Sequence, residues 1–493
     1  MSEAFTTLLL TPDEMAAADA AASASGLDSF GLMEKAGQAV AAAALRRYPQ
    51  TQRFVILCGP GNNGGDGYVA ARALASTGSA VTVHTLGDPE RLAGDARRAF
   101  DLCPVMPEPL QRFEPRAGDT VIDAIFGAGL ARAVPEDVRQ AIARMENSGV
   151  PLIAVDLPSG LCGRSGTVLG AAFRADITVT FMARKPGHML MPGRSLCGDI
   201  GIFDIGIPHR IIRAAAGTTR LNHPILWEHL LPSPDAASHK YRRGHLAVFS
   251  GGASHTGAAR LSASAGLAAG AGLVTLVSPG DAMATNASHL TAVMLREIET
   301  VDALEDWLSD ARLSAFVLGP GFGVGEKTRA FALALAGHPL VLDADGITSF
   351  RGERDNLFHA CQGEEPRLVL TPHEGEFARL FPDLADKQGY GKVEKALAAA
   401  ALANAVIVYK GADTIIAAPD GRAVINANAP PWLATAGSGD VLAGMIGALL
   451  ANGLPAYEAA AAGVHLHGGA AMRAKPGMTA EELVRHIQPQ AAN

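Results

Sequence analysis

The 493-residue sequence lacks the features that mark secreted and membrane-spanning proteins. Its five cysteines (Cys58, Cys103, Cys162, Cys197 and Cys361) include no Cys-x-x-Cys pair. An odd cysteine count without metal-ligand spacing excludes a disulfide framework and favours reduced thiols in the cytoplasm. The N-terminus has no basic and apolar regions of a signal peptide, and the longest apolar runs are too short to span a membrane. We therefore expect a cytoplasmic protein without a membrane partner.

Aromatic and charged residues are also scarce, at 5% and 18% of the chain, and the net charge is −8. A general nucleic-acid binder needs basic stripes and stacking rings, so we expect no nucleic-acid partner. A local basic pocket for a phosphorylated small molecule remains compatible with this composition. Because 48% of the residues are hydrophobic, the chain can bury large cores. At about 150 residues per domain, its length corresponds to two or three domain-sized units.

The first half alternates β-rich apolar runs with helical patterns. We expect helices at 12–22, 30–47, 66–76 and 135–147, and strands at 53–58, 80–86, 120–128, 151–157, 176–182 and 199–206. Strands that alternate with helices of about 10–15 residues imply parallel βαβ crossovers. The pattern predicts an α/β domain with a Rossmann-like, doubly wound sheet.

The alternation breaks at Pro208–Ser238, which contains four prolines and no periodic strand. Apolar strands then return near residues 245, 273, 315, 340, 367 and 405. The two halves share a βα style but no motif, which indicates two distinct α/β domains rather than a duplication. We predict domains at 1–212 and 236–493, joined by a linker at 213–235.

A glycine-rich turn, Gly59-PGNNGGDG-Tyr68, follows the first strand and opens a helix. Such a turn exposes backbone N–H groups and a helix dipole to a ligand phosphate. It is neither a P-loop nor a strict G-x-G-x-x-G fingerprint. The polar side chains of Asn62, Asn63 and Asp66 favour a binding role over a merely tight turn.

Two further strand ends fit the same crevice. Asp123 ends one strand, and Asp156 ends the next with Ser159 three residues later. Ligands of parallel sheets bind beyond the carboxyl ends of the strands, so these side chains should converge there. Taken singly, each aspartate could equally be a helix N-cap. Asn63, Asp123 and Ser159 together offer oxygen ligands for a hard cation.

The series GNNGGDG, DAIFGAGLAR, VDLPSG and FMARKPG resembles the YjeF N-terminal, NAD(P)H-hydrate epimerase family over about residues 10–210. The resemblance implies K⁺ at Asn63, Asp123 and Ser159, and an acid/base role for Asp156. Epimerisation inverts the hydroxyl-bearing C6 of the reduced nicotinamide, which requires such a group. Lys185 is expected to stabilise developing charge or to tune Asp156, with a solvated surface lysine as the alternative. The implied contacts to the hydrated dinucleotide are Asn62, Asn63, Gly64, Gly65, Asp66, Gly127, Ala128, Gly129, Leu130, Ala131, Arg132, Ala133 and Asp156.

In the second half, Ala434-TAGSGDVLAGMIGALL places a glycine-rich turn before an apolar helix. Backbone N–H groups of Gly437–Gly439 could form an anion hole for a phosphoryl group, and Asp440 could take the proton of an attacking hydroxyl. A glycine-rich N-cap with an acid on the first turn is the simpler alternative.

Other motifs follow apolar strands on the same expected sheet edge: SGGASHTGAA, GPGFG, DADG, TPHEGEF and YKGADT. Over about residues 225–490 the series resembles the NAD(P)H-hydrate dehydratase family, which is ribokinase-like. The resemblance implies substrate contacts at Ala258, Gly321, His373 and Asp440, although His373 could simply cap a helix. It places the nucleotide on Lys410, Gly411, Ala412, Asp413, Thr414 and Gly439.

Together the two resemblances imply a bifunctional enzyme acting on the hydrates NADHX and NADPHX. Phosphoryl transfer from ADP with Mg²⁺ would make the C6 oxygen a leaving group. An ordinary small-molecule kinase is the alternative for the second half, and a binding module is the alternative for the first. Assemblies are usual in both families, so we expect a homo-oligomer.

Overall fold

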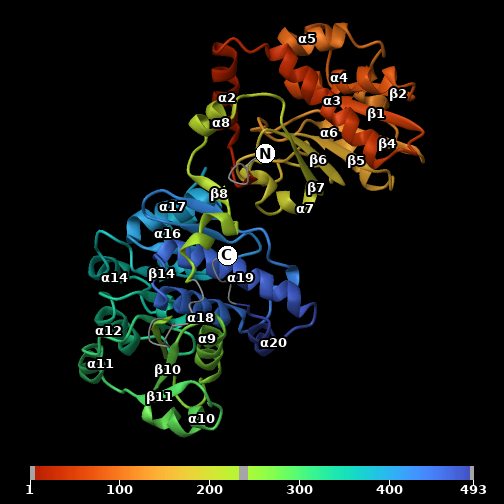
Figure 1. The fold of residues 1–493 in the computed structure, drawn as a ribbon. Coiled ribbons are helices and arrows are strands. Elements are labelled where there is room, and N and C mark those ends of the chain that lie inside the picture. Colours follow the sequence, from red (N-terminus) through yellow and green to blue (C-terminus); the bar gives the residue numbers. More distant parts are fainter. Residues whose placement is uncertain (1–5, 233–242, 489–493) are drawn as a thin grey trace. The chain divides into compact units, whose positions relative to one another are not determined.

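A computed structural model describes residues 6–232 and 243–488, which form two compact units divided between Thr219 and Arg220 (Figure 1). Both units are α/β, as the sequence predicts. None of the helices in the described ranges is long and apolar enough to cross a membrane.

The first unit contains a seven-stranded parallel sheet of order β3-β2-β1-β4-β5-β6-β7. The strand order reverses between the neighbours β1 and β4, which opens a crevice at their carboxyl ends. The strands are β1 (Arg53–Cys58), β2 (Val81–Thr85), β3 (Glu108–Pro109), β4 (Asp119–Ala124), β5 (Leu152–Val155), β6 (Ile177–Phe181) and β7 (Asp199–Phe203).

Helices cover both faces of this sheet, which explains why its strands read as continuous apolar runs. In β1, Phe54 and Ile56 pack in the cluster that contains α3 and α4, whereas Val55 and Leu57 pack in the cluster that contains α6. The helices are α2 (Pro12–Ala24), α3 (Ser29–Arg47), α4 (Asn62–Ser76), α5 (Gly94–Asp101), α6 (Glu136–Glu146), α7 (Gly193–Leu196) and α8 (His209–Ala215).

The second unit is built on a ten-stranded sheet of order β11-β10-β9-β12-β13-β14-β15-β16-β17-β8. The strands from β11 to β15 are parallel, so their carboxyl ends share one edge; β16 is antiparallel to β15 and β17. The strands are β8 (Thr219–Leu221), β9 (His245–Phe249), β10 (Leu273–Ser278), β11 (Met294–Glu297), β12 (Ala315–Leu318), β13 (Leu340–Leu342), β14 (Leu368–Leu370), β15 (Val406–Tyr409), β16 (Ile415–Ala417) and β17 (Ala423–Ile425).

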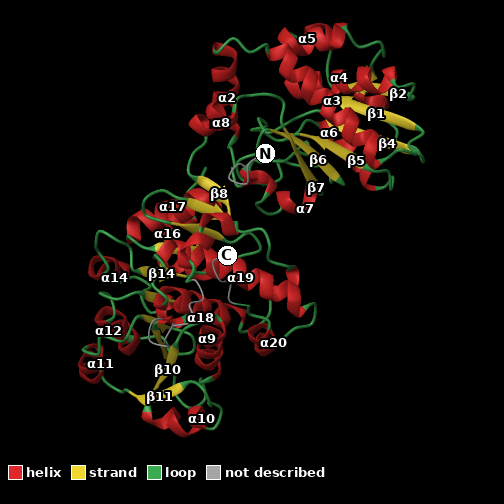
Figure 2. Cartoon of the chain, in the orientation of Figure 1, coloured by secondary structure: helices red, strands yellow, loops and turns green. Residues whose placement is uncertain are grey.

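Helices pack around this sheet too (Figure 2). The central one is α18 (Ser438–Ala451), whose residues from Val441 onward are all buried, and it packs against α9 and α19. The other helices are α9 (Gly257–Ala268), α10 (Met283–Ala287), α11 (Val301–Leu308), α12 (Glu326–Ala334), α13 (Asp345–Thr348), α14 (Arg354–Ala360), α15 (Glu374–Leu380), α16 (Pro382–Ala385), α17 (Lys392–Ala403), α19 (Ala456–Ala474) and α20 (Ala480–Arg485).

Part of the predicted linker at 213–235 is folded, which corrects the expectation that no strand lies there. Strand β8 forms one edge of the second sheet, and the N–H of Asn222 donates to the carbonyl of Ile425 at 2.9 Å. Trp227 is fully buried and donates its indole N–H to Asn222 Oδ1 at 3.1 Å. A three-residue strand is too short to show an alternating pattern. Residues 233–235 of the predicted linker and 236–242 of the predicted second domain lie outside the described residues.

Candidate active sites

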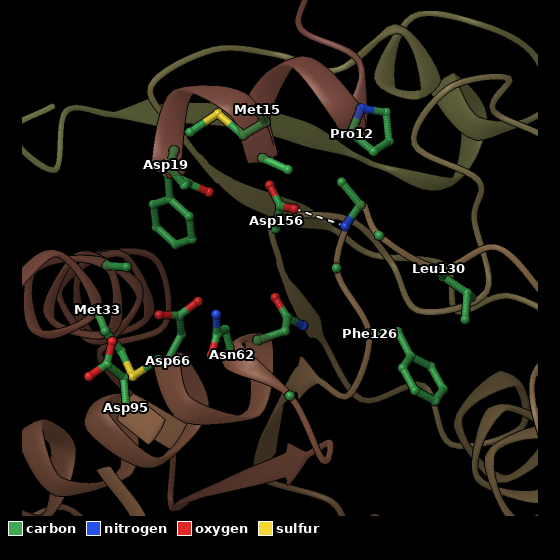
Figure 3. Close-up of a pocket in the computed structure, with 18 of the residues that line it drawn as sticks. Pro12, Met15, Asp19, Met33, Asn62, Asp66, Asp95, Phe126, Leu130 and Asp156 are labelled. Carbon is green, nitrogen blue, oxygen red and sulfur yellow. Dashed lines mark hydrogen bonds between the residues drawn. The ribbon is translucent and has the colours of Figure 1, made fainter. Parts of the chain in front are cut away.

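A cavity of about 790 Å³ lies at the carboxyl ends of the first sheet (Figure 3). Helix α2 contributes Pro12, Met15 and Asp19 to its wall, opposite residues that follow β1, β4 and β5. The predicted residues that line it are Asn62, Asn63, Asp66, Gly127, Ala128, Gly129, Leu130, Ala131, Arg132, Asp156 and Lys185. Gly64, Gly65 and Ala133 are outside the lining. Most of the strand-end residues therefore converge on one cavity.

The two glycines outside the lining serve helix packing. A Cβ on Gly64 would lie 2.0 Å from the Gly59 carbonyl oxygen, and one on Gly65 would lie 2.6 Å from Met33 Cε. Gly61, the N-cap of α4, has nothing within 4 Å of its Cβ position. The glycines at 64 and 65 thus let the start of α4 pack closely against α3 and against the loop that contains Gly59. The helix begins at Asn62, four residues earlier than predicted.

Asp156 is the most tightly held side chain of the cavity. Its Oδ1 accepts hydrogen bonds from the Lys185 ammonium and from Thr180 Oγ1 at 2.9 Å, and its Oδ2 accepts from the Ala128 N–H at 2.9 Å. The Lys185 side chain is only 2% exposed, so it is no solvated surface lysine. Burial raises the pKa of Asp156, but Lys185 and the Ala128 N–H outweigh it and lower the pKa to about 2. Asp156 is therefore an ionised carboxylate at neutral pH.

Asp19 and Asp66 have the opposite electrostatic character. Burial, with a contribution from Asp156, raises the pKa of Asp19 to about 6. Burial, together with Asp156 and Asp19, raises the pKa of Asp66 well above its ordinary value. The cavity thus combines an ionised carboxylate with two carboxyl groups whose pKa values are raised. The sequence analysis did not identify Asp19, although Pro12, Met15 and Asp19 recur at helical spacing.

Of the predicted cation ligands, Asn63 lines the cavity, whereas Asp123 and Ser159 lie outside its lining. Asp123 and Ser159 are fully buried; Ser159 donates its hydroxyl to Asp123 Oδ1 at 2.6 Å and its N–H to Oδ2 at 2.7 Å. Burial raises the pKa of Asp123 to about 6, because its hydrogen-bond partners Ser159 and Ile125 are neutral. The Asn63 side chain has a buried Nδ2 without a partner among the described residues. The Asp123 carboxylate, the Ser159 hydroxyl and the Asn63 Oδ1 are oxygen ligands of the type that a hard cation such as K⁺ prefers, whereas the unpartnered Nδ2 of Asn63 is a donor and is not a cation ligand.

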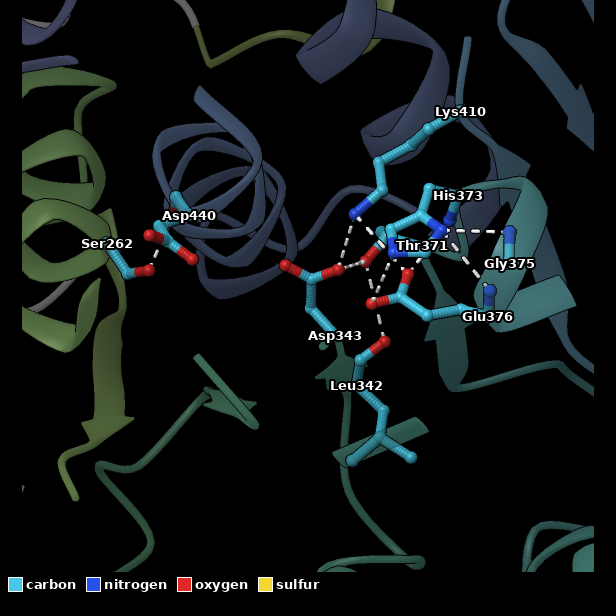
Figure 4. Close-up of polar contacts among 9 residues, drawn as sticks. All are labelled: Ser262, Leu342, Asp343, Thr371, His373, Gly375, Glu376, Lys410 and Asp440. Atoms are coloured by element: carbon cyan, nitrogen blue, oxygen red, sulfur yellow. Dashed lines mark hydrogen bonds and ion pairs between the residues drawn. The ribbon is translucent and has the colours of Figure 1, made fainter. Parts of the chain in front are cut away.

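The second site lies at the shared strand edge of the second sheet (Figure 4). Lys410, after β15, donates to Asp343 Oδ1 at 2.7 Å, and Thr371 donates to the same oxygen at 2.7 Å. Glu376 Oε2 lies 3.9 Å from the Lys410 ammonium. The sequence analysis did not identify Asp343, Thr371 or Glu376 as site residues, although it noted the motifs DADG and TPHEGEF that contain them.

The glycine-rich start of α18 adjoins this cluster. Gly437 is its N-cap with φ 85°, and a Cβ on Gly439 would lie 3.5 Å from the Lys410 ammonium and 3.9 Å from Asp343 Oδ2. Burial, and then Asp343, raises the pKa of Asp440 to about 6, although Lys410 opposes them. The arrangement places a lysine, backbone N–H groups and a titratable aspartate together, as phosphoryl transfer requires.

The remaining predicted residues occupy neighbouring loops. A Cβ on Gly321 would lie 3.4 Å from that of Ala258, so these two predicted substrate contacts are neighbours. His373 is the N-cap of α15: its Nδ1 accepts from the Gly375 N–H at 2.9 Å, while its side chain stays 55% exposed. His373 therefore caps α15 through Nδ1, as the alternative interpretation predicts. Its Nε2 takes no part in the cap.

The predicted nucleotide segment 410–414 is a closed turn. Thr414 Oγ1 donates to the Gly411 carbonyl at 2.9 Å, and Asp413 accepts from Lys392 at 2.6 Å. The Asp413 and Thr414 side chains therefore support the turn, and Gly411 and Ala412 are exposed. Across the described ranges, no group of three or more His, Cys, Asp or Glu side chains could hold a metal ion.

Comparisons with known proteins connect both units to one family. Residues 29–187 match the family model described as YjeF-related protein N-terminus, and residues 246–489 match NAD(P)H-hydrate dehydratase. The bifunctional NAD(P)H-hydrate repair enzyme of Thermofilum pendens is 35% identical, over 92% of this chain and 90% of that one. The chain belongs to the bifunctional NAD(P)H-hydrate repair enzymes.

Other members of this repair-enzyme family are equally similar. The enzyme of Moorella thermoacetica is 36% identical over 94% of this chain and 91% of that one. Among solved structures, the ADP/ATP-dependent NAD(P)H-hydrate dehydratase of Bacillus subtilis, co-crystallised with ATP and Mg²⁺, is 26% identical. It covers 52% of this chain and 92% of that one, with a TM-score of 0.44. The family predicted from the motifs is confirmed for both halves of this repair enzyme.

Proposed function

We propose that the first unit interconverts the R and S hydrates of NADH and NADPH at C6, and that the second dehydrates the S form with ADP. The observation that carries the first assignment is the ionised Asp156, paired with Lys185 at the cavity wall. The second rests on Asp440 beside the Lys410–Asp343 pair.

For epimerisation, Asp156 accepts the proton of the C6 hydroxyl as the C6–N1 bond of the ring opens. Lys185 and Thr180 hold the Asp156 carboxylate in place through hydrogen bonds to its Oδ1. Reclosure on the other face of C6 inverts the carbon, and Asp156 returns the proton. Asp66, with its raised pKa, is the cavity group suited to supply a proton to the ring nitrogen.

The Asp156→Asn variant tests this role, since general acid–base catalysis contributes about 10²–10⁴-fold. We expect epimerisation to fall by at least about a hundredfold, while dinucleotide binding survives. Asp119→Asn is the matched control, because it removes a buried aspartate whose partner Arg53 lies at the amino end of β1. Retained epimerisation in Asp156→Asn would contradict the assignment.

K⁺ would be held by Asn63, Asp123 and Ser159, where it would place a positive charge beneath the 125–128 loop. Phe126 in this loop already donates its N–H to Ser159 Oγ at 2.8 Å. We expect epimerisation to rise with K⁺ and not with Li⁺, and we expect Asp123→Asn to remove that dependence. Equal rates in both salts would contradict the K⁺ site.

For dehydration, Asp440 takes the proton of the C6 hydroxyl as its oxygen receives the β-phosphoryl of ADP, which leaves AMP. The Gly437–Gly439 N–H groups and Lys410 face the transferring phosphoryl, whose charge bound Mg²⁺ would neutralise. The ring nitrogen then expels phosphate from C6, and loss of a C5 proton restores NAD(P)H. We propose substrate contacts at Ala258, Gly321 and His373, and nucleotide contacts along 410–414 and at Gly439.

The products distinguish this reaction from an ordinary kinase reaction. Free phosphate and AMP should appear in step with NADH, with ADP preferred over ATP. A phosphorylated nicotinamide product that persists would instead indicate a small-molecule kinase. The cytoplasmic location and the homo-oligomer remain predictions.

A further inference from the structure

A buried histidine joins the two members of the Asp156–Lys185 pair through their backbones. His188 ends the 3₁₀ turn η3 (Pro186–His188) and is fully buried. Its Nε2 lies 2.8 Å from the carbonyl oxygen of Asp156, and its Nδ1 lies 2.9 Å from the backbone nitrogen of Lys185. Because a carbonyl only accepts and an N–H only donates, Nε2 carries the proton and Nδ1 is the acceptor.

The backbone of Asp156 needs such support. Its φ of 64° lies in the left-handed region, which costs a non-glycine residue about 1 kcal/mol or more. Its N–H donates to the Val179 carbonyl at 2.8 Å, which anchors the residue to β6. The His188 Nε2–H anchors the other side of the same residue. The side-chain direction of Asp156 is thus set by one strand and one imidazole.

The turn that carries His188 is itself tightly packed. A Cβ on Gly187 would lie 2.5 Å from the Cys162 carbonyl oxygen, and the Gly187 N–H donates to the Gly163 carbonyl at 2.8 Å. His188 therefore cannot shift without moving the 162–163 segment. Burial, and then Lys185, lowers the pKa of His188 to about 4, which keeps the ring neutral and Nδ1 able to accept.

We propose that His188 is a positioning residue for epimerisation, which holds the Asp156 carboxylate and the Lys185 ammonium in one fixed arrangement beneath C6. This inference rests on the proposed role of Asp156. His188 does not line the cavity and touches no reacting atom. Loss of its bond to Asp156 should therefore lower kcat and leave KM for the dinucleotide nearly unchanged.

Three substitutions distinguish the effect of each His188 hydrogen bond from the effect of filling the space of the ring. His188→Phe keeps a planar ring and removes both bonds. His188→Gln places an amide N–H near the position of Nε2, and so retains the bond to Asp156. His188→Asn places an amide oxygen near Nδ1, and so retains only the local bond to Lys185. A merely structural role in the turn would be rescued by Asn, whereas a role in holding Asp156 is rescued by Gln.

The full-length chain is assayed for epimerisation of the R hydrate and, separately, for ADP-dependent dehydration of the S hydrate, which monitors the second unit. We expect a ten- to hundredfold lower epimerase kcat, on the order seen for supporting residues, in Phe and Asn and recovery in Gln. Dehydration should stay within about twofold of wild type. In an Asp156→Asn background, His188→Phe should cause no further loss, because the two act as one unit.

The outcomes separate this inference from the proposed function. If wild type fails to epimerise, or Asp156→Asn is fully active, the proposed function fails first. If wild type epimerises, Asp156→Asn does not, and His188→Phe retains full kcat, only the positioning role is overturned. A loss in Phe that Asn restores and Gln does not also overturns it. If Phe fails to fold, the comparison of Gln with Asn still decides.

Discussion

Single carboxyl groups in the two sites differ in charge state because their neighbours differ. Asp156 has a lysine ammonium, a hydroxyl and a backbone N–H on its oxygens, which together outweigh burial. Asp440 has Asp343 as its strongest neighbouring charge, which adds to burial. The first aspartate is ionised at all physiological pH values, whereas the second titrates near them.

The pKa of Asp440, raised to about 6, gives the dehydratase an acid limb. Only the ionised form can take the hydroxyl proton, so kcat/KM for the S hydrate should fall tenfold per pH unit below about 6. Removing the like charge with Asp343→Asn should move this limb to lower pH, even where the maximal rate also falls. The pH profile of NADH formation measures both. An unchanged limb in Asp343→Asn would contradict the assigned coupling.

Titration of Asp156 should not give the epimerase such a limb, since Asp156 stays ionised down to about pH 2. The lowered pKa of Asp156 also makes the stability of the folded protein depend on pH, because the ionised form of Asp156 favours the folded state. Asp156 stabilises the fold above its unfolded pKa of about 4, and this contribution disappears as the pH falls toward about 2. Lys185→Met removes the cause of the depression, so the variant should be less stable than wild type at pH 7. The difference should shrink toward pH 3, as urea unfolding at a series of pH values would reveal.

Helix α4 shows how an element depends on residues with poor helix propensity. Its first turns contain Asn62, Asn63, Gly64 and Gly65, which disfavour a helix on their own. Gly64 is required because the Gly59 carbonyl leaves no room for a Cβ, whereas a Cβ on Gly65 would displace the end of the flexible Met33 side chain. The sequence pattern does not show this packing requirement, and so the predicted helix starts only at Asp66.

Gly64→Ala should therefore destabilise the first unit by about 3 kcal/mol or more, since overpacking against backbone cannot relax easily. Gly61→Ala is the matched control, because nothing lies within 4 Å of its Cβ position. Urea unfolding should place Gly61→Ala within about 1 kcal/mol of wild type, allowing for context effects on surface sites. Equal stability of the two variants would show that the close approach of α4 is not required.

Most of the secondary structure was predictable from the sequence because buried parallel strands are continuous apolar runs. β1, β4, β9 and β12 lie within one residue of their predicted starts. The short strands β3, β8, β11, β16 and β17 were missed, although β13 and β14, which have three residues each, were predicted. The position of Asp156 at the end of β5, where it lines the cavity, was predicted on the same ground. Thr180 and His188 were not, because only tertiary packing brings them to Asp156.

At the scale of the whole molecule, the division between the units lies between Thr219 and Arg220, after Pro208 but before Pro224, Pro232 and Pro234. A fragment that begins at residue 236 lacks β8 and the fully buried Trp227. Loss of a buried tryptophan alone costs about 3–5 kcal/mol. We expect a 218–493 fragment to unfold cooperatively in urea and to retain dehydration of the S hydrate, and we expect a 236–493 fragment to be markedly less stable. Equal midpoints for both fragments would contradict the assignment of residues 220–231 to the second unit.

A dehydratase specific for the S hydrate would leave the R hydrate unrepaired. An epimerase in the same chain removes this problem, because it converts the R hydrate to the S hydrate. The central claim is that Asp156 and Asp440 serve two consecutive reactions on the same substrate.

The most direct test follows the near-ultraviolet absorbance of NADH after adding enzyme, Mg²⁺ and ADP to an equal mixture of R and S NADHX. Wild type should recover all of the NADH, Asp156→Asn should stop at half, and Asp440→Asn should recover none. Full recovery by Asp156→Asn, or any rapid recovery by Asp440→Asn, would contradict the account.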